Sequence, residues 1–209
     1  MSGSNDVDVL REALERDEPP PIGQQFRLIR AAMRSDPAAA SRLMQQAYVR
    51  GLEGAYAAGD DAGLASLATL GAVVLDSVGD HAGAIARLDQ ALTLASEDGE
   101  ARPRILATRA IYEAVGEQLS EARTSLVAAA DAIPAAASME TRLDVEMCTA
   151  MVSCVALDLG ELPQASSTIA DAQAERLDSI ASALMVYLTE TLGAIGESSE
   201  ARAWADALQ

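Results

Sequence analysis

LASLATLGAVVLDSVGDHAGAIARLDQALTLA, residues 64–95, decides the fold of this chain. The pattern of its apolar residues predicts two helices and a turn, at 61–77, Val78-Gly79-Asp80 and 82–96. In the second helix a small, a large apolar and a small residue recur at helical spacing, namely Ala84, Leu88 and Ala91. A small residue lets two helix backbones approach, and the larger residue one turn later fills the space beside them. The stretch therefore predicts a helix-turn-helix unit.

The same triad of small, apolar and small residues recurs along the chain. Its other copies are Ala40-Met44-Ala47, Ala122-Leu126-Ala129, Ala165-Ile169-Ala172 and, more loosely, Ala201-Ala205-Leu208. In three copies a glycine stands five residues before the first alanine and supplies the conformation that ends the preceding helix, at Gly79, Gly160 and Gly196. Each helix pair leaves an apolar face that only its neighbour can cover, so such units come in series. We therefore expect an all-α solenoid of about five antiparallel helix pairs.

The other expected helices follow from the same pattern. They lie at 22–34 and 37–58, 103–115 and 119–132, 138–158 and 162–174, and 177–194 and 198–208. Ahead of them a short amphipathic helix is expected over 5–17, with Val7, Leu10 and Leu14 on one face. The run Asp17-Glu18-Pro19-Pro20-Pro21 then breaks the helix and favours an extended link.

We therefore divide the chain into an N-terminal amphipathic helix with a proline-rich link, 1–21, and a helical repeat domain, 22–209. The N-terminal segment is either a docking arm or a frayed end. The chain stops within the last expected helix, with no polar capping helix after it. Solenoid ends normally need such a cap, so we expect either more protein or another subunit to cover this end.

The composition limits the classes of function. The net charge is −17, and all 15 basic residues are arginines scattered among 32 acidic residues. Binding to nucleic acid needs a basic stripe, so we expect no direct binding of nucleic acid and no anionic membrane partner. No apolar stretch is long enough to span a membrane, and the N-terminus has no apolar signal core, which favours a cytoplasmic protein. The high alanine and arginine content without lysine indicates a GC-rich bacterial genome.

No residue pattern in the chain points to a reaction. No Cys or His cluster has metal-ligand spacing, so we expect no metal, no cofactor and no catalytic residue. For His81, the only histidine, we expect a structural or solvated role, and for Asp60-Asp61 a helix-capping role. Cys148 and Cys154 point about 120° apart on one helix and cannot bridge. Trp204 and Leu208 share a face of the last helix, where they serve either core packing or a terminal interface.

The triads and turns resemble the tetratricopeptide repeat over residues 22–209. The resemblance is closest at Ala72, Gly79, Asp80, Ala84, Leu88 and Ala91. The usual large aromatic residue of the first helix is absent, and the step from Gly116 to Ala122 is one residue too long. The repeat units are uneven and longer than the common ~34 residues. Such lengthened units resemble the helical sensor regions of bacterial multidomain regulators, and the family resemblance implies a right-handed solenoid.

The resemblance also implies a concave groove lined by the first helix of each pair. Its positions in this chain are Ser66, Thr69, Val73, Asp76, Ile111, Met147, Ala150, Cys154, Leu157, Val186 and Glu190. Ala110 is the other candidate in the third pair, where the register is open between it and Ile111. The chain has no lysine, and its only asparagine is Asn5. In this family, lysine and asparagine in the groove bind the terminal carboxylate or the backbone of a peptide, so these two binding modes are less favoured here. A small, apolar groove containing methionine suits an amphipathic helix from a partner, from the N-terminal arm or from a second copy.

The leading hypothesis from the sequence is a non-enzymatic protein–protein interaction module. We expect it to be the regulatory, sensory or oligomerisation domain of a bacterial signalling protein. The alternative is a small-molecule or peptide sensor that controls an attached output domain. An enzyme is the weakest hypothesis, because the sequence offers no cluster of titratable residues.

Overall fold

The computed structural model describes residues 3–14, 57–76, 79–156 and 162–177. It also describes isolated positions, namely 28, 31–32, 35–36, 38–40, 42–43, 48, 54, 180–181, 184–185 and 188. Within these residues all regular secondary structure is helical, as the sequence predicts. The chain divides into two compact units, unit 1 from Met1 to Ala95 and unit 2 from Ser96 to Gln209.

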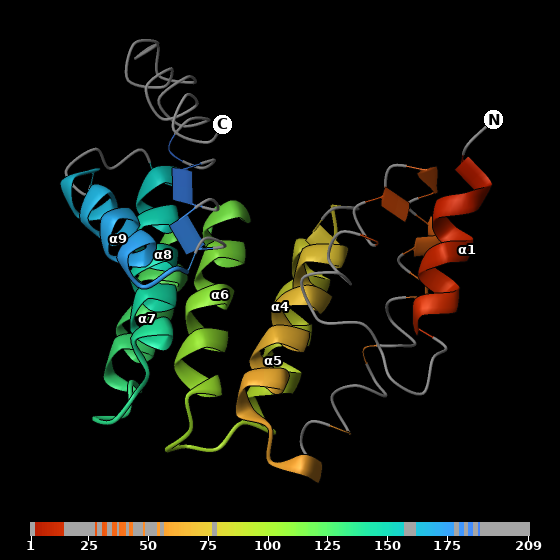
Figure 1. Cartoon of the computed structure of the whole chain (residues 1–209). Coiled ribbons are helices and arrows are strands. Elements are labelled where there is room, and N and C mark those ends of the chain that lie inside the picture. The colour runs from red at the N-terminus through yellow and green to blue at the C-terminus, as the bar shows by residue number, and fades with distance from the viewer. Residues whose placement is uncertain are drawn as a thin grey trace. The chain divides into compact units, whose positions relative to one another are not determined.

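Unit 1 contains three described helices, α1 (Gly3–Leu14), α4 (Asp61–Asp76) and α5 (His81–Leu92). The helices α4 and α5 follow one another along the chain and pack together (Figure 1). The helix α5 ends four residues earlier than predicted, because its last turn tightens and the N–H of Leu94 donates to the carbonyl three residues back, that of Ala91, at 3.0 Å. The predicted end of α1 lies outside the described residues.

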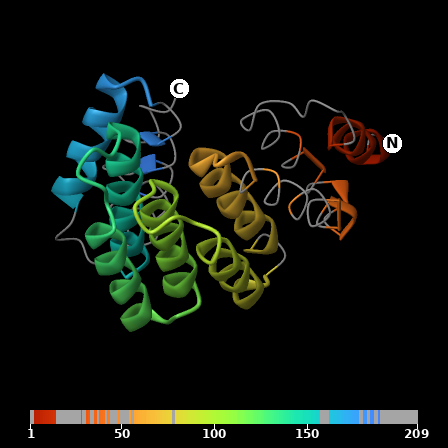
Figure 2. The same ribbon diagram turned by 90° about the horizontal axis from the view of Figure 1, so that it is seen from below.

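Unit 2 contains α6 (Ala101–Val115), α7 (Leu119–Asp131), α8 (Met139–Val155) and α9 (Leu162–Ala174). The helix α6 packs against α7 and α8, and α8 packs in turn against α9 (Figure 2). The bounds of α9 agree with the prediction at both ends. Beyond α9, Leu177, the first residue of the next predicted helix, is not helical, because its N–H closes the turn that ends α9. The later described positions of that helix are helical and buried, namely Ile180, Ala181, Leu184, Met185 and Leu188.

The repeated triads supply buried residues in both units. Of their described members, all but one are buried: Ala40, Ala84, Leu88, Ala91, Ala122, Ala129, Ala165, Ile169 and Ala172. Leu126 is half-buried. The copy at 201–208 and two members of the first copy, Met44 and Ala47, lie outside the described residues. Alanine at these positions leaves little side chain between neighbouring helices, so their backbones can lie close together.

Three helices end in the same backbone turn. One residue in each turn takes the left-handed conformation, with φ of 80° at Gly79, 64° at Glu117 and 59° at Arg176. The next N–H then donates to a carbonyl five residues back, as from Gln118 to Glu113 at 2.8 Å. This is the hydrogen-bond pattern of a glycine-type helix C-cap.

The turn explains the irregular spacing of the third pair. Glu117, not Gly116, stands five residues before Ala122, which is the position that Gly79 holds before Ala84. The spacing of the unit is therefore conventional, and a glutamate takes a conformation that usually belongs to glycine.

A short motif begins each helix of the α4–α5 pair. The sequences GDDAG (59–63) and GDHAG (79–83) place an aspartate just before each helix. The Asp60 carboxylate accepts the N–H of Gly63 at 2.8 Å, and the Asp80 carboxylate accepts that of Gly83 at 2.8 Å. A Cβ on either second glycine would lie 2.2 Å from a carboxylate oxygen, so glycine leaves room for the cap. The structure thus supports the capping role expected at Asp60.

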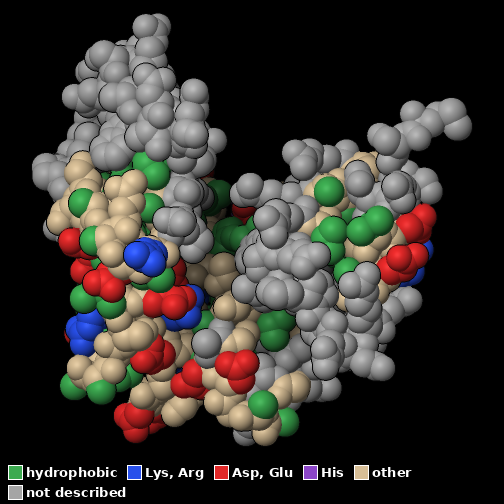
Figure 3. Space-filling view, viewed as in Figure 1, with side chains coloured by type: hydrophobic (Ala, Val, Ile, Leu, Met, Phe, Trp, Pro, Cys, Tyr) green, Lys and Arg blue, Asp and Glu red, His purple; other side chains and the backbone are tan. Residues whose placement is uncertain are grey.

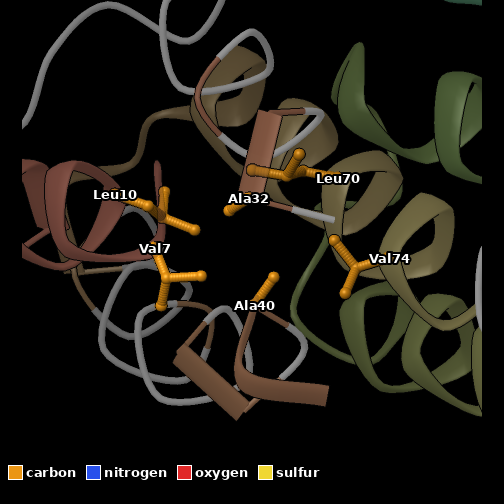
Figure 4. Close-up of a cluster of buried hydrophobic side chains, with 6 residues drawn as sticks. All are labelled: Val7, Leu10, Ala32, Ala40, Leu70 and Val74. Carbon is orange, nitrogen blue, oxygen red and sulfur yellow. The ribbon is translucent and has the colours of Figure 1, made fainter. Parts of the chain in front are cut away.

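The helix α1 contributes to the core of unit 1. Val7 and Leu10 are 7% and 0% exposed and share one hydrophobic cluster with residues of the predicted first pair and of α4. The other members are Ala32, Ala40, Leu70 and Val74, and all six side chains converge on one centre (Figure 4). In Figure 4, Ala32 and Ala40 lie between Val7 and Leu10 of α1 on one side and Leu70 and Val74 of α4 on the other. Two residues of the apolar face predicted for the N-terminal helix, Val7 and Leu10, are therefore buried, while the side chain of Leu14 lies outside the described residues.

Tyr48 joins the predicted first pair to the α4–α5 pair. Its hydroxyl donates to the carbonyl of Arg87 at 3.1 Å, and the Arg87 guanidinium lies 5.6 Å from the centre of its ring. Burial raises the pKa of Tyr48 to about 12, while the nearby Arg87 charge opposes that rise. A Cβ on Gly71 would lie 2.5 Å from Cε2 of the ring, so the tyrosine packs directly on the α4 backbone.

We predict that Gly71→Ala destabilises unit 1. The new methyl group forces the Tyr48 ring away from α4 and strains its hydrogen bond to Arg87, which outweighs the gain in helix propensity. The free energy of unfolding in urea should fall by about 1–3 kcal/mol. The matched control is Gly54→Ala, because Gly54 is helical and a Cβ there meets nothing within 4 Å. The control should leave stability unchanged or raise it, and equal effects of the two changes would contradict the assignment.

We also predict that Glu117→Gly stabilises unit 2. The left-handed conformation costs a residue other than glycine about 1–2 kcal/mol, and the greater freedom of glycine in the unfolded chain offsets part of the gain. The free energy of unfolding should therefore rise by about 0.5–1 kcal/mol. Gly79→Ala makes the reverse change in the equivalent turn of unit 1, and it should lower the free energy of unfolding. A loss of stability in Glu117→Gly would show that its side chain makes a stabilising contact that outweighs the strain.

Candidate functional site

The helix α4 carries the described part of the predicted groove in unit 1. Ser66, Thr69, Val73 and Asp76, which we call the α4 stripe, follow helical spacing along one face. Val73 is 37% exposed, and it is among the few large hydrophobic side chains that are exposed in the described part of the chain. The other three side chains are half-buried. The stripe thus presents one apolar side chain between small polar ones.

The last residue of the α4 stripe contacts the only histidine of the chain. Nδ1 of His81 lies 2.7 Å from Oδ1 of Asp76, and both side chains are partly exposed, at 39% and 35%. His81 opens α5 directly after the Asp80 cap. The contact therefore joins the end of α4 to the start of α5, which is the structural role that the sequence predicts for His81.

The predicted groove residues of unit 2 are mostly buried. Ile111, Ala150 and Cys154 are 7%, 3% and 5% exposed, and Met147 is half-buried. The reason lies in the packing, since α8 contacts α6, α7 and α9. In this structure these side chains serve helix–helix packing, and among them only Met147 reaches the surface. The alternative position Ala110 is also buried.

Five predicted site residues lie outside the described part of the chain. They are Leu157, Val186 and Glu190 of the groove and Trp204 and Leu208 of the terminal interface. Their assignment stays a prediction from the sequence.

Glu100 links the start of α6 to the start of α8. Its carboxylate accepts the N–H of Ser138 at 3.0 Å, the hydroxyl of Ser138 at 2.5 Å and the hydroxyl of Thr141. Ser138 is also the N-cap of α8 and accepts the N–H of Thr141 at 3.2 Å. Hydrogen bonds, first from Ser138 and then from Thr141, lower the pKa of Glu100.

Arg104 makes a second link between α6 and α8. Its Nε lies 2.8 Å from Oδ2 of Asp144, and both side chains are 17% exposed. A terminal nitrogen of the guanidinium lies 3.4 Å from Glu140 on the same helix. Burial opposes the charge on Arg104, but the Asp144 carboxylate more than offsets this effect and raises the pKa of the guanidinium. Burial also raises the pKa of the neighbouring Cys148 thiol, which keeps that thiol protonated.

Glu113 makes a buried link between α6 and α7. Its side chain is 2% exposed, and it accepts a hydrogen bond from the hydroxyl of Ser125 at 2.7 Å. Oε1 of the same carboxylate lies 3.0 Å from Nε of Arg109, one turn earlier on α6. Both carboxylate oxygens are thus engaged, as a buried charge requires.

The sequence analysis does not identify these three links. A signal existed for one of them, because Arg109 and Glu113 have the i, i+4 spacing of a helix ion pair. The partners of Glu100 and Arg104 are Ser138 and Asp144, which lie some forty residues further along the sequence. A local sequence pattern cannot predict contacts at that separation. In the structure all three links connect helices to one another.

Two further findings concern the described residues only. No group of three or more His, Cys, Asp or Glu side chains there is placed to hold a metal ion. Among the described helices, none has the length and apolarity needed to cross a bilayer. On the face shown in Figure 3, carboxylates are spread over the α6–α9 helices with fewer arginines among them.

Comparison with known proteins finds no match for this chain among protein-family models, curated proteins or solved structures. The likeness to the tetratricopeptide repeat therefore stands on the residues of the chain itself.

We predict that Glu100→Gln reduces the dependence of stability on pH. The pKa of Glu100 is lowered from its ordinary 4.5 in the folded chain, so its contribution is present above about pH 4.5 and is lost as the pH falls toward the lowered value. Urea unfolding at pH 7 and at pH 4 should show a smaller loss for Glu100→Gln than for the unchanged chain. Glu97→Gln, exposed in the same loop, is the matched control. The same loss in all three proteins would rule out a stabilising role for the Glu100 links.

Proposed function

We propose that this chain is a non-enzymatic protein–protein interaction module that binds an amphipathic helix. The helix comes from a partner protein or from a second copy of the chain. The module serves as the regulatory, sensory or oligomerisation part of a bacterial signalling protein. The observation that carries the proposal is the α4 stripe, which leaves Val73 37% exposed on a helix whose neighbouring apolar residues are buried.

The packing of the described helices supports a surface function. Their apolar residues and their buried polar links are engaged in holding one helix against another. In unit 1, which carries the α4 stripe, the Tyr48 ring packs on the α4 backbone at Gly71 and its hydroxyl donates to the carbonyl of Arg87 on α5. A framework of this kind fixes the positions of its outer side chains, and a rigid outer face is what a helix-binding module needs.

The chemistry of the stripe indicates the kind of helix that would bind. Val73 offers an apolar contact, while Ser66 and Thr69 are small enough to let a second helix approach closely. A helix with apolar anchors at i, i+3 and i+4 fits such a surface. The net charge of −17 favours a partner whose polar face is basic, because opposite charges speed the encounter.

The proposal predicts that Val73→Arg removes a binding partner. The arginine places a long charged side chain in the middle of the stripe, where an apolar anchor would sit. Proteins from a source-cell lysate would be captured on the unchanged chain and on two variants and then identified by mass spectrometry. The control variant is Val127→Arg, since Val127 is 62% exposed and belongs to α7 of unit 2, not to α4.

At least one protein, or the chain itself, should be retained by the unchanged chain and by Val127→Arg and lost by Val73→Arg. Circular dichroism would establish that all three are equally helical. Identical capture by all three would contradict binding at the α4 stripe.

A further inference from the structure

The outer side of α7 carries the most exposed large hydrophobic side chain in the described part of the chain, that of Val127, which is 62% exposed. The helix packs on α6 and also contacts α8 (Figure 1). Its buried residues are Ala122, Ser125 and Ala129. At about 100° per residue, Val127 points about 140–160° away from each of them. Val127 therefore stands near the centre of the outer side and adds little to the packing of its own unit.

Two opposite charges flank Val127 at equal spacing. Arg123 precedes it by four residues and Asp131 follows it by four, so each lies about 6 Å from it along the helix axis and within about 40° of its direction. Both side chains are exposed, and within the described residues neither forms an ion pair. Thr124 and Ala130, beside Val127, are exposed and small enough to let a second helix approach. We call these five residues the α7 face.

The order of the two charges indicates which molecule fits the α7 face. When two copies of α7 pack antiparallel about a two-fold axis at Val127, each Arg123 lies level with the Asp131 of the other copy, and the two valines meet at the centre. A two-fold interface is self-complementary in this way, because the same surface serves both copies. In a parallel pair, each charge would instead face its own copy, and like charges repel. An antiparallel second copy thus covers the valine and pairs both charges.

We propose that the α7 face is a self-association surface, on which a second copy of this chain packs through its own α7 in antiparallel orientation. The helix has 13 residues and is about 20 Å long, so the contact is small. The dimer should accordingly be weak, with a dissociation constant of about 10–100 μM. The inference goes beyond the proposed function, since it uses a helix of unit 2 and does not depend on the α4 stripe.

The first test exchanges the two charges in the full chain. Arg123→Asp and Asp131→Arg would be made singly and together, and the dimer followed by light scattering coupled to size exclusion at rising concentration. Each single change sets like charges opposite one another and should weaken the dimer at least about tenfold, whereas the double change should restore it. Both changes suit the α7 macrodipole, which favours an acid nearer the start of a helix and a base at its end, so the variants should fold.

A mixture of the two single variants makes the test independent of folding defects. One variant then carries an acid at both positions and the other a base at both. Opposite charges therefore face one another again when the two variants pair. Each variant alone should be mostly monomeric at a concentration where the mixture, measured in the same way, associates at least as well as the unchanged chain.

The second test removes the apolar contact. Val127→Arg sets two positive charges against one another at the centre of the α7 face, so this variant should stay monomeric over the tested range. The matched control is Val73→Arg, because Val73 is also an exposed valine but belongs to α4 of unit 1. This control should form the dimer as the unchanged chain does. Circular dichroism would establish that both variants are as helical as the unchanged chain.

Three results would overturn the proposal. An unchanged chain that stays monomeric at the highest concentration would show that the α7 face does not self-associate. A dimer that keeps its strength in Val127→Arg, or that Val73→Arg abolishes instead, would show self-association through another surface. Failure of both the double change and the mixture to restore the dimer would rule out antiparallel charge pairing.

The outcome for the proposed function remains distinguishable from these results. In the capture experiment, the chain itself should be lost by Val127→Arg, whereas a partner protein bound at the α4 stripe should be lost by Val73→Arg. Loss of only one of these two captures shows which of the two surfaces has been assigned correctly.

Discussion

The close approach of helices over alanine is the constraint on which the rest of the structure depends. Ala84, Ala122 and Ala165 are buried, and each places only a methyl group between its own helix and the neighbouring one. Close packing of this kind gains dispersion energy only if the turns hold each helix in place. The ends of the helices are accordingly fixed by specific contacts. Left-handed turns occur at Gly79 and Glu117, and the carboxylates of Asp60 and Asp80 cap the starts of α4 and α5.

Polar side chains add further contacts between the helices that pack over alanine. In unit 2, Glu100, Arg104 and Glu113 each reach from α6 to a neighbouring helix, so α6 is bonded on two sides. In unit 1, Tyr48 plays a comparable part through the carbonyl of Arg87. These polar interactions hold helices to one another within each unit, while Val73 and Val127 leave apolar side chains exposed. This division of roles is the physical basis of the proposed interaction function.

The helices could be predicted from the sequence because they depend on local periodicity and caps, and α9 agrees with its prediction at both ends. The end of α5 could not, since it depends on the change in backbone hydrogen bonding beyond Leu92. Of the candidate site, the positions of the α4 stripe came from the family resemblance, and helical spacing places Ser66, Thr69 and Val73 on one face of α4. The burial of Ile111 and Ala150 could not be predicted, because it depends on which neighbours α6 and α8 acquire in three dimensions.

The buried hydrogen bond between Ser125 and Glu113 affects the register in which α7 packs against α6. Surfaces made of alanine have little relief, so a helix could slide along its neighbour by one turn and lose few apolar contacts. A slip of α7 along α6 would separate Ser125 from Glu113 and leave a carboxylate that is 2% exposed without its hydroxyl. Because such a loss is costly in a low-dielectric interior, this hydrogen bond acts together with the turn at Glu117 to hold α7 in one register against α6.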